Sequence, residues 1–88
     1  MKINKIAKAG TLESNDILIM VLPNESHGVK IEIESIVMNQ FGKQIEAAIM
    51  DQIKKMKIED IKVKAQDKGA LDYTIRSRVQ TAVERALK

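Results

Sequence analysis

The chain has 88 residues, of which 44% are hydrophobic and 31% charged, and its formal net charge is +3. These values predict one globular domain, residues 1–88, and exclude a disordered chain. Without cysteine, the chain has no disulfide and no thiolate for catalysis or metal binding. The N-terminus has no long apolar stretch typical of a signal peptide or membrane helix, so we expect a cytoplasmic protein with no membrane partner.

The first part of the chain is predicted to hold three strands. Residues 10–13 are typical of a short strand, and the polar residues 13–16 are typical of a turn. The apolar run 17–22 predicts a buried central strand, which places Ser14 at or beside the tip of a hairpin. After a polar loop at 23–28, residues 29–34 alternate between apolar and charged side chains, which predicts a strand with one face in a core.

The second part is predicted to add a helix, a strand and a helix. Apolar residues spaced by three and four from Met38 to Met56 indicate the first helix, with Ser35 or Asn39 as its cap. Residues 61–65 alternate as a strand, 67–70 form a turn, and 71–87 carry one apolar face. The expected fold class is α+β: a two-layer sandwich of a mainly antiparallel four-stranded sheet with two helices on one face, in the order β-β-β-α-β-α.

Few side chains are candidates for chemistry. His27 is the single histidine and has no second ligand nearby, so we expect neither a catalytic nor a metal site. Glu32 and Glu34 share one face of a strand and are expected to be solvated rather than an acid/base pair. Phe41 and Tyr73 are too few aromatic residues for a sheet that stacks bases, so nucleic-acid binding is not expected.

Ser14 remains as the candidate residue. Serine is common in turns, and the residues alone favour a structural role. No base in the neighbouring sequence would make Ser14 a nucleophile. A serine exposed in a hairpin turn is nevertheless accessible to a modifying enzyme, which would bring its own base.

Several separated stretches resemble the citrate lyase acyl carrier protein, the gamma chain. Residues 9–14 (AGTLES) resemble the start of that family, residues 40–42 (QFG) its first helix, and residues 67–72 (DKGALD) a turn; residues 76–78 (RSR) stand at the matching place in the last helix. The resemblance spans nearly the whole chain and is weakest at 22–30. Asn15 stands where the family often has glycine, and the tail that some members carry after the last helix is absent.

The resemblance implies a concrete function. In that family the serine that matches Ser14 holds 2'-(5''-phosphoribosyl)-3'-dephospho-coenzyme A through a phosphodiester. The thiol of this arm carries acetyl, the transferase (alpha) subunit exchanges acetyl for citrate, and the lyase (beta) subunit cleaves the citryl group to oxaloacetate and regenerates the acetyl thioester. The implied protein is therefore a non-catalytic carrier whose partners are these two subunits and the transferase that attaches the prosthetic group.

Two alternatives and four residue roles stay open. The carrier subunit of malonate decarboxylase uses the same type of prosthetic group, although AGTLES favours citrate lyase. An unmodified α+β module that binds protein or nucleic acid is the alternative from another class. Asp67 and Asp72 either build a loop and a helix start or have a further role, and Arg76 and Arg78 either contact phosphates or partner subunits or are solvated.

Overall fold

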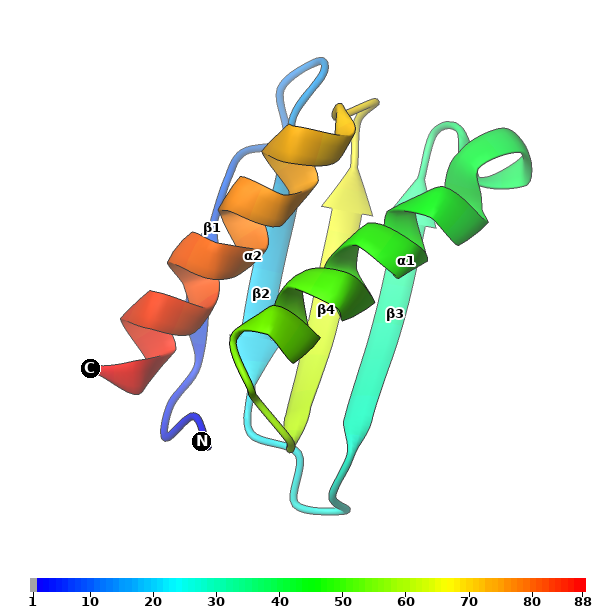
Figure 1. Cartoon of the computed structure of the whole chain (residues 1–88). Coiled ribbons are helices and arrows are strands. Elements are labelled where there is room, and N and C mark those ends of the chain that lie inside the picture. The colour runs from blue at the N-terminus through cyan, green and yellow to red at the C-terminus, as the bar shows by residue number, and fades with distance from the viewer. Residues whose placement is uncertain (1) are drawn as a thin grey trace.

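The computed structural model describes residues 2–88 and confirms the expected α+β fold (Figure 1). Strands β1 (Ala7–Ala9), β2 (Ile17–Leu22) and β3 (Val29–Ser35) come first along the chain. Helix α1 (Met38–Lys55), strand β4 (Ile61–Asp67) and helix α2 (Asp72–Leu87) follow. This is the order β-β-β-α-β-α that the sequence predicts.

The four strands form one mixed sheet in the order β1-β2-β4-β3. β1 pairs with β2 and β2 with β4 in antiparallel fashion, whereas β3 and β4 are parallel and are joined through α1. The apolar run of β2 lies inside the sheet, where alternate residues are fully buried. The strictly alternating β3 is an edge strand, which leaves its inward side chains only partly buried.

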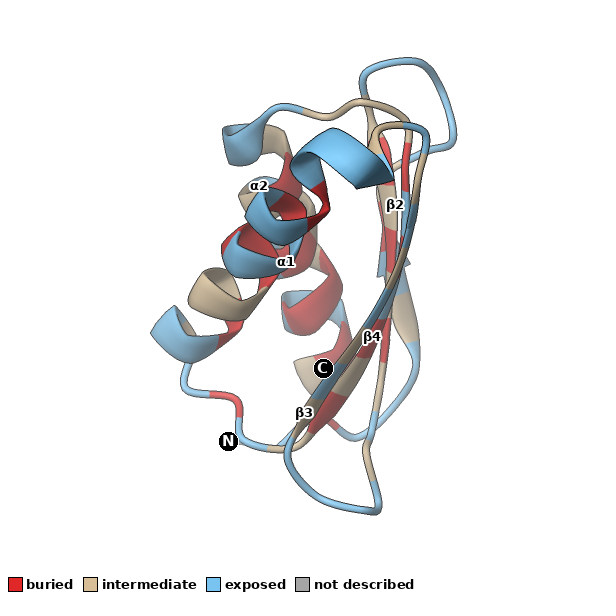
Figure 2. Cartoon of the chain, turned by 90° about the vertical axis from the view of Figure 1, so that its right-hand side faces the viewer, coloured by how far each residue is buried: buried red, intermediate tan, exposed pale blue. Residues whose placement is uncertain are grey.

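Both helices cover the same face of the sheet (Figure 2). The core lies between the two layers, and burial of each Ile or Val in it contributes about 1.5–3 kcal/mol. Its fully buried side chains come from both central strands and both helices, and include Ile17, Ile19, Val21, Ile49, Ile53, Ile61, Val63, Val79 and Val83.

The first strand is not where the sequence predicts it. Residues 10–13 were expected as a strand, but the strand is Ala7–Ala9 and residues 10–16 form the connection to β2. Gly10 ends the strand because its φ of +96° lies in the left-handed region. A Cβ atom at Gly10 would lie 1.9 Å from the carbonyl oxygen of Ile17, so only glycine fits at this position.

The start of α1 also differs from expectation. The helix follows Val37 with no side-chain cap, so capping by Ser35 or Asn39 is wrong; Ser35 is the last residue of β3. Met38 and Phe41, which were expected in the apolar stripe, are 44% and 49% exposed. Both lie in the first turns of α1, which begins at one end of the sheet (Figure 1).

Candidate functional site

Ser14 lies in the connection between β1 and β2, at the end of the sheet that we call the serine end. β3 and β4 run antiparallel to β2, so both finish at the end where β2 begins. The two helices begin after these strands, so the first turns of α1 and α2 lie at the serine end as well (Figure 1). Ser14 therefore lies at the same end of the sheet as the connections that lead into α1 and α2.

A four-residue turn presents Ser14 to solvent. The backbone N–H of Asp16 donates to the carbonyl oxygen of Glu13 at 3.2 Å, which makes Ser14 and Asn15 the central residues. Asn15 takes φ +64°, a left-handed conformation that asparagine tolerates well. Ser14 is exposed, and its hydroxyl has no hydrogen-bond partner among residues 2–88. The hydroxyl is therefore accessible to another protein.

The carboxylate of Asp16 holds the turn on the side of α2. Arg78 donates Nε to one carboxylate oxygen and Nη2 to the other, each at 3.0 Å. The Thr11 hydroxyl and the Ile17 backbone N–H donate to the same carboxylate, both at 2.7 Å. Above all the Arg78 hydrogen bonds lower the pKa of Asp16 to about 2. The carboxylate is therefore ionised at neutral pH and fixes the base of the turn.

The connection between β4 and α2 holds the turn on its other side. The Asn15 N–H donates to the carbonyl oxygen of Lys68 at 2.8 Å, and the Lys68 N–H donates to that of Asp16 at 2.9 Å. These two bonds continue the pairing of β2 with β4 beyond the strands. The Ser14 turn is thus attached to the fold at two independent places.

Asp67 gives this connection its shape. Its side chain is buried and accepts hydrogen bonds from the Ser35 hydroxyl at 2.7 Å and from the backbone N–H groups of Gly69 and Ala70 at 3.1 and 2.9 Å. A buried carboxylate is tolerated only when it is fully hydrogen-bonded, as it is here. Of the two roles left open for Asp67, the structure assigns the loop-building one.

Both arginines of residues 76–78 are engaged by carboxylates of the same chain. Arg78 is engaged by Asp16, and Arg76 binds Asp72 at 2.7 Å and also Asp51. The hydrogen bond from Arg76 is the main reason that the pKa of Asp51 is lowered. Because Asp51 belongs to α1, this contact ties the two helices together. Both arginines, and Asp72 as a partner, have structural roles.

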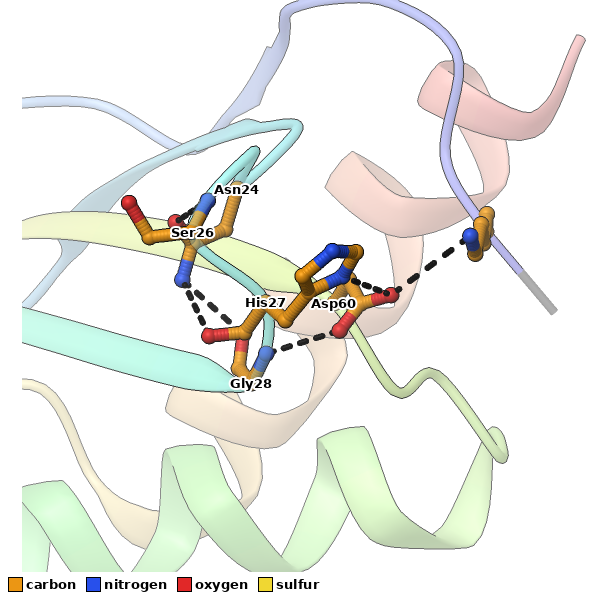
Figure 3. Close-up of polar contacts among 6 residues, drawn as sticks. Asn24, Ser26, His27, Gly28 and Asp60 are labelled. Carbon is orange, nitrogen blue, oxygen red and sulfur yellow. Dashed lines mark hydrogen bonds and ion pairs between the residues drawn. The ribbon is translucent and has the colours of Figure 1, made fainter.

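His27 lies at the other end of the molecule. It belongs to the loop between β2 and β3, and the whole length of β2 separates it from Ser14. Its Nδ1 is 3.4 Å from an oxygen of Asp60, whose other oxygen accepts the Gly28 N–H at 2.7 Å (Figure 3). The Asn24 side chain also bonds within this loop. His27 therefore takes part in closing a loop, far from the serine end.

The remaining charged candidates form no site. Glu32 and Glu34 are exposed, and Glu32 pairs with Lys30 at 4.0 Å. No group of three His, Asp or Glu side chains in residues 2–88 would suit a metal ion. Within the same residues, neither helix combines the length and apolar character that crossing a membrane requires.

Large apolar side chains are exposed in the segments that meet at the serine end. There are six such residues, and exposed apolar side chains that gather in one region often mark an interaction surface. They are Leu12, Ile36, Met38, Phe41, Leu71 and Tyr73.

The sequence analysis singled out Ser14 as a candidate but did not predict most of the contacts that hold its turn. No contact among Thr11, Asp16 and Lys68 was predicted, although all three belong to polar turns. The polar turn after Ser14 was a signal for local backbone bonding. The contact between Asp16 and Arg78 has no local signal, because 62 residues separate the two.

Comparisons with known proteins agree on one family. The family model of the malonate decarboxylase delta subunit matches residues 4–86. The citrate lyase acyl carrier protein of Halothermothrix orenii is 48% identical over 88 residues, which cover 100% of this chain and 93% of that protein. The protein of the same name from Lactiplantibacillus plantarum is 47% identical, over 100% of this chain and 91% of its own length.

Solved structures share the fold at low sequence identity. A chain of the Pseudomonas malonate decarboxylase hetero-tetramer aligns with a TM-score of 0.78 at 15% identity, covering 98% of this chain and 88% of that one. A homoserine kinase from Cytophaga hutchinsonii aligns with a TM-score of 0.61 at 13% identity, with 34% of its chain covered. The same α+β arrangement therefore occurs in proteins of unlike function.

Proposed function

Since the chain belongs to the family of citrate lyase and malonate decarboxylase acyl carrier proteins, we propose that it is the acyl carrier subunit of citrate lyase and that Ser14 bears its prosthetic group. The names of the relatives favour citrate lyase over malonate decarboxylase. The structural neighbour in malonate decarboxylase, at 15% identity, speaks only for the fold. Carriers of this family are non-catalytic, and we propose that the site of action is the cytoplasm.

One observation carries the proposal: Ser14 offers an unengaged hydroxyl on a turn that is fixed on both sides. The hydroxyl has no partner in the described part of the chain, whereas the flanking backbone bonds Lys68 and Asp16 binds Arg78. A covalent arm needs an accessible oxygen at its base and a rigid platform below it. Both requirements fit a phosphodiester at Ser14.

The proposed group is 2'-(5''-phosphoribosyl)-3'-dephospho-coenzyme A, and its thiol would supply the thioester that carries acetyl and citryl groups between subunits. Ser14 Oγ would hold it through a phosphoester bond. Asp16 and Arg78 would keep the attachment point in place while the arm moves. Attachment to one carrier raises the effective concentration of the acyl group at the active sites that the arm reaches.

The surroundings of Ser14 also suit the proposed partners. The enzyme that attaches the arm, and the transferase and lyase subunits that use it, must all approach the serine end. The exposed apolar side chains there, among them Leu12 and Tyr73, offer surface that is buried favourably on contact. The proposed complex is therefore a hetero-oligomer assembled around this end.

The experiment is intact-mass analysis and peptide mapping after co-expression with the prosthetic-group enzymes of the citrate lyase complex. A mass increase that matches phosphoribosyl-dephospho-coenzyme A, mapped to Ser14, is expected in the wild type and in Ser77→Ala, which removes another exposed serine. Ser14→Ala is expected to stay unmodified. An unmodified wild type, under conditions that modify a known carrier, would reject the proposal in favour of an unmodified binding module.

A further inference from the structure

An apolar groove opens between the start of α1 and the connection that leads into α2. Its volume is about 350 Å³, within the range of small-molecule sites. The side chains of Phe41 and Leu71 on its lining are 49% and 57% exposed. The lining residues are Val37, Phe41, Gln44, Ile45, Asp67, Gly69, Ala70, Leu71, Asp72 and Ile75.

The lining of the groove comes close to Asn15, the residue that follows the proposed attachment point in the sequence. Gly69 belongs to its lining, and a Cβ atom at Gly69 would lie 3.6 Å from the side-chain oxygen of Asn15. Asn15 is the neighbour of Ser14 in the turn and bonds the Lys68 carbonyl. A group attached to Ser14 therefore needs to pass only the connection between β4 and α2 to enter the groove.

The charges on the two sides of this connection differ. The groove contains two carboxylates, Asp67 and Asp72, and no cationic side chain. On the other side, Lys68 lines a separate cavity with Leu12 of the connection between β1 and β2, and Glu34 and Asp67 line that cavity too. No cationic side chain in the groove would pair with a phosphate, so its lining suits a neutral part of an arm better than a charged one.

One polar side chain in the groove is unengaged. The amide of Gln44 has no hydrogen-bond partner among residues 2–88, and it stands on α1 one turn from Phe41. An amide of this kind pairs with adenine through two hydrogen bonds, and an aromatic ring stacks on the face of a base. A ring, a free amide and apolar walls together match a neutral planar base.

On the basis of the proposed function, we propose that the adenine of the Ser14-bound arm rests in this groove, stacked on Phe41 and hydrogen-bonded by Gln44. In the proposed prosthetic group the phosphoribosyl unit joins the ribose that bears the adenine, so the base comes before the diphosphate and the thiol along the arm. Binding of the base would fix the first part of the arm and leave the part that ends in the thiol free to move.

The test is NMR on the full-length modified protein, with the protein labelled by ¹³C and ¹⁵N and the arm unlabelled. Intact mass first establishes that Ser14 carries the arm. Nuclear Overhauser contacts are then measured from adenine H2 and H8 to the Phe41 ring and the Leu71 methyl groups. The variants are Phe41→Ala and Gln44→Leu; Tyr73→Ala is the matched control, because Tyr73 is an exposed aromatic residue at the same end outside the groove.

The expected result is contacts to Phe41 and Leu71 in the wild type and in Tyr73→Ala, their loss in Phe41→Ala, and their weakening in Gln44→Leu. Two results would overturn the binding of adenine in the groove and leave the carrier function intact. One is adenine chemical shifts equal to those of free dephospho-coenzyme A in a fully modified sample, and the other is Overhauser contacts only to residues outside the groove. Contacts that form only when a partner subunit is added would overturn it equally. A sample that gains no mass overturns both proposals.

Discussion

Arg78 and Asp16 are separated by 62 residues of sequence, yet two guanidinium nitrogens of the arginine each lie 3.0 Å from one carboxylate oxygen of the aspartate. The contact joins the last helix to the base of the turn that presents Ser14. It depends on the planar fork of a guanidinium, which the ammonium group of lysine does not reproduce. Replacing Arg78 by lysine therefore tests whether the contact needs the shape of the guanidinium group or only its positive charge.

Arg78→Lys should lower the free energy of unfolding by about 1–3 kcal/mol, because it replaces a two-point charged hydrogen bond to a largely buried carboxylate. Urea denaturation measures the change. Arg85→Lys serves as the control, since Arg85 is exposed and bonds a backbone carbonyl, and should change stability by less than about 1 kcal/mol. Equal effects of the two variants would contradict a special role for the Asp16 contact.

The same carboxylate predicts a pH dependence. Folding lowers the pKa of Asp16 from 3.8 to about 2, and its side chain is only 13% exposed. A depressed carboxylate pKa stabilises the fold above pH 4, and that contribution of about 2 kcal/mol is lost as pH falls through 2. The difference in unfolding free energy between wild type and Asp16→Asn should therefore shrink from pH 5 to pH 2. A difference that stays constant with pH would contradict the ionised contact.

Gly10→Ala should be far more destabilising than Gly28→Ala. Both glycines have positive φ, +96° and +85°, but a Cβ at Gly10 would lie 1.9 Å from a carbonyl oxygen, whereas nothing lies within 4 Å at Gly28. We expect about 1–2 kcal/mol at Gly28 from backbone strain and about 3 kcal/mol or more at Gly10 from strain and steric overlap. Thermal or urea unfolding compares the pair, and similar losses would exclude the close approach.

Ser35→Ala should destabilise the protein by about 1–3 kcal/mol, because the buried Asp67 carboxylate loses a hydroxyl donor. Ser77→Ala, at an exposed helical position, should lie within about 0.5 kcal/mol of the wild type. Amide hydrogen exchange in the Asp67 loop gives a second measurement. The amides of Gly69 and Ala70 should exchange faster in Ser35→Ala than in the wild type, and at the wild-type rate in Ser77→Ala. Unchanged protection in that variant would mean that the carboxylate does not depend on Ser35.

Two substitutions at Lys68 distinguish the role of its backbone from the role of its side chain. Lys68→Pro removes the N–H that donates to the Asp16 carbonyl, so we expect a loss of about 1–3 kcal/mol and slower modification of Ser14. Lys68→Ala keeps both backbone bonds and should retain stability within about 0.5 kcal/mol. Unfolding free energies and the time course of the mass increase test the pair. If proline is as well tolerated as alanine, the backbone contact does not support the turn.

Local patterns were sufficient for most of the fold. The apolar run at 17–22, the alternation at 29–34 and 61–65, and the two helical stripes each depend on residues close in sequence, and each predicted its element correctly. The strand order was not predictable from them, because the parallel pairing of β3 with β4 depends on which edge of β4 is free after β2 has paired. The position of the first strand was not predictable for the same reason. It ends at Gly10 because of a close approach to Ile17, which the local pattern does not show.

The Ser14 turn was only partly predictable from the sequence. The polar residues 13–16 predicted a turn, and the resemblance of residues 9–14 to a known family indicated Ser14 as the candidate. The features that fix the turn come from Lys68 and Arg78, whose contacts with residues 15–16 span more than half of the chain. Ion pairs of this range carry no periodic signal, so the arginine was left with two open roles until the fold was known.

The position of these contacts along the chain also has a consequence for synthesis. A ribosome synthesises a protein from its N-terminus, so Ser14 leaves the ribosome long before Lys68 and Arg78, the residues that hold its turn. A nascent or truncated chain therefore contains the serine without the structure around it. If Ser14 bears the proposed group, an enzyme that recognises the ordered turn would modify only chains that have been completed and folded.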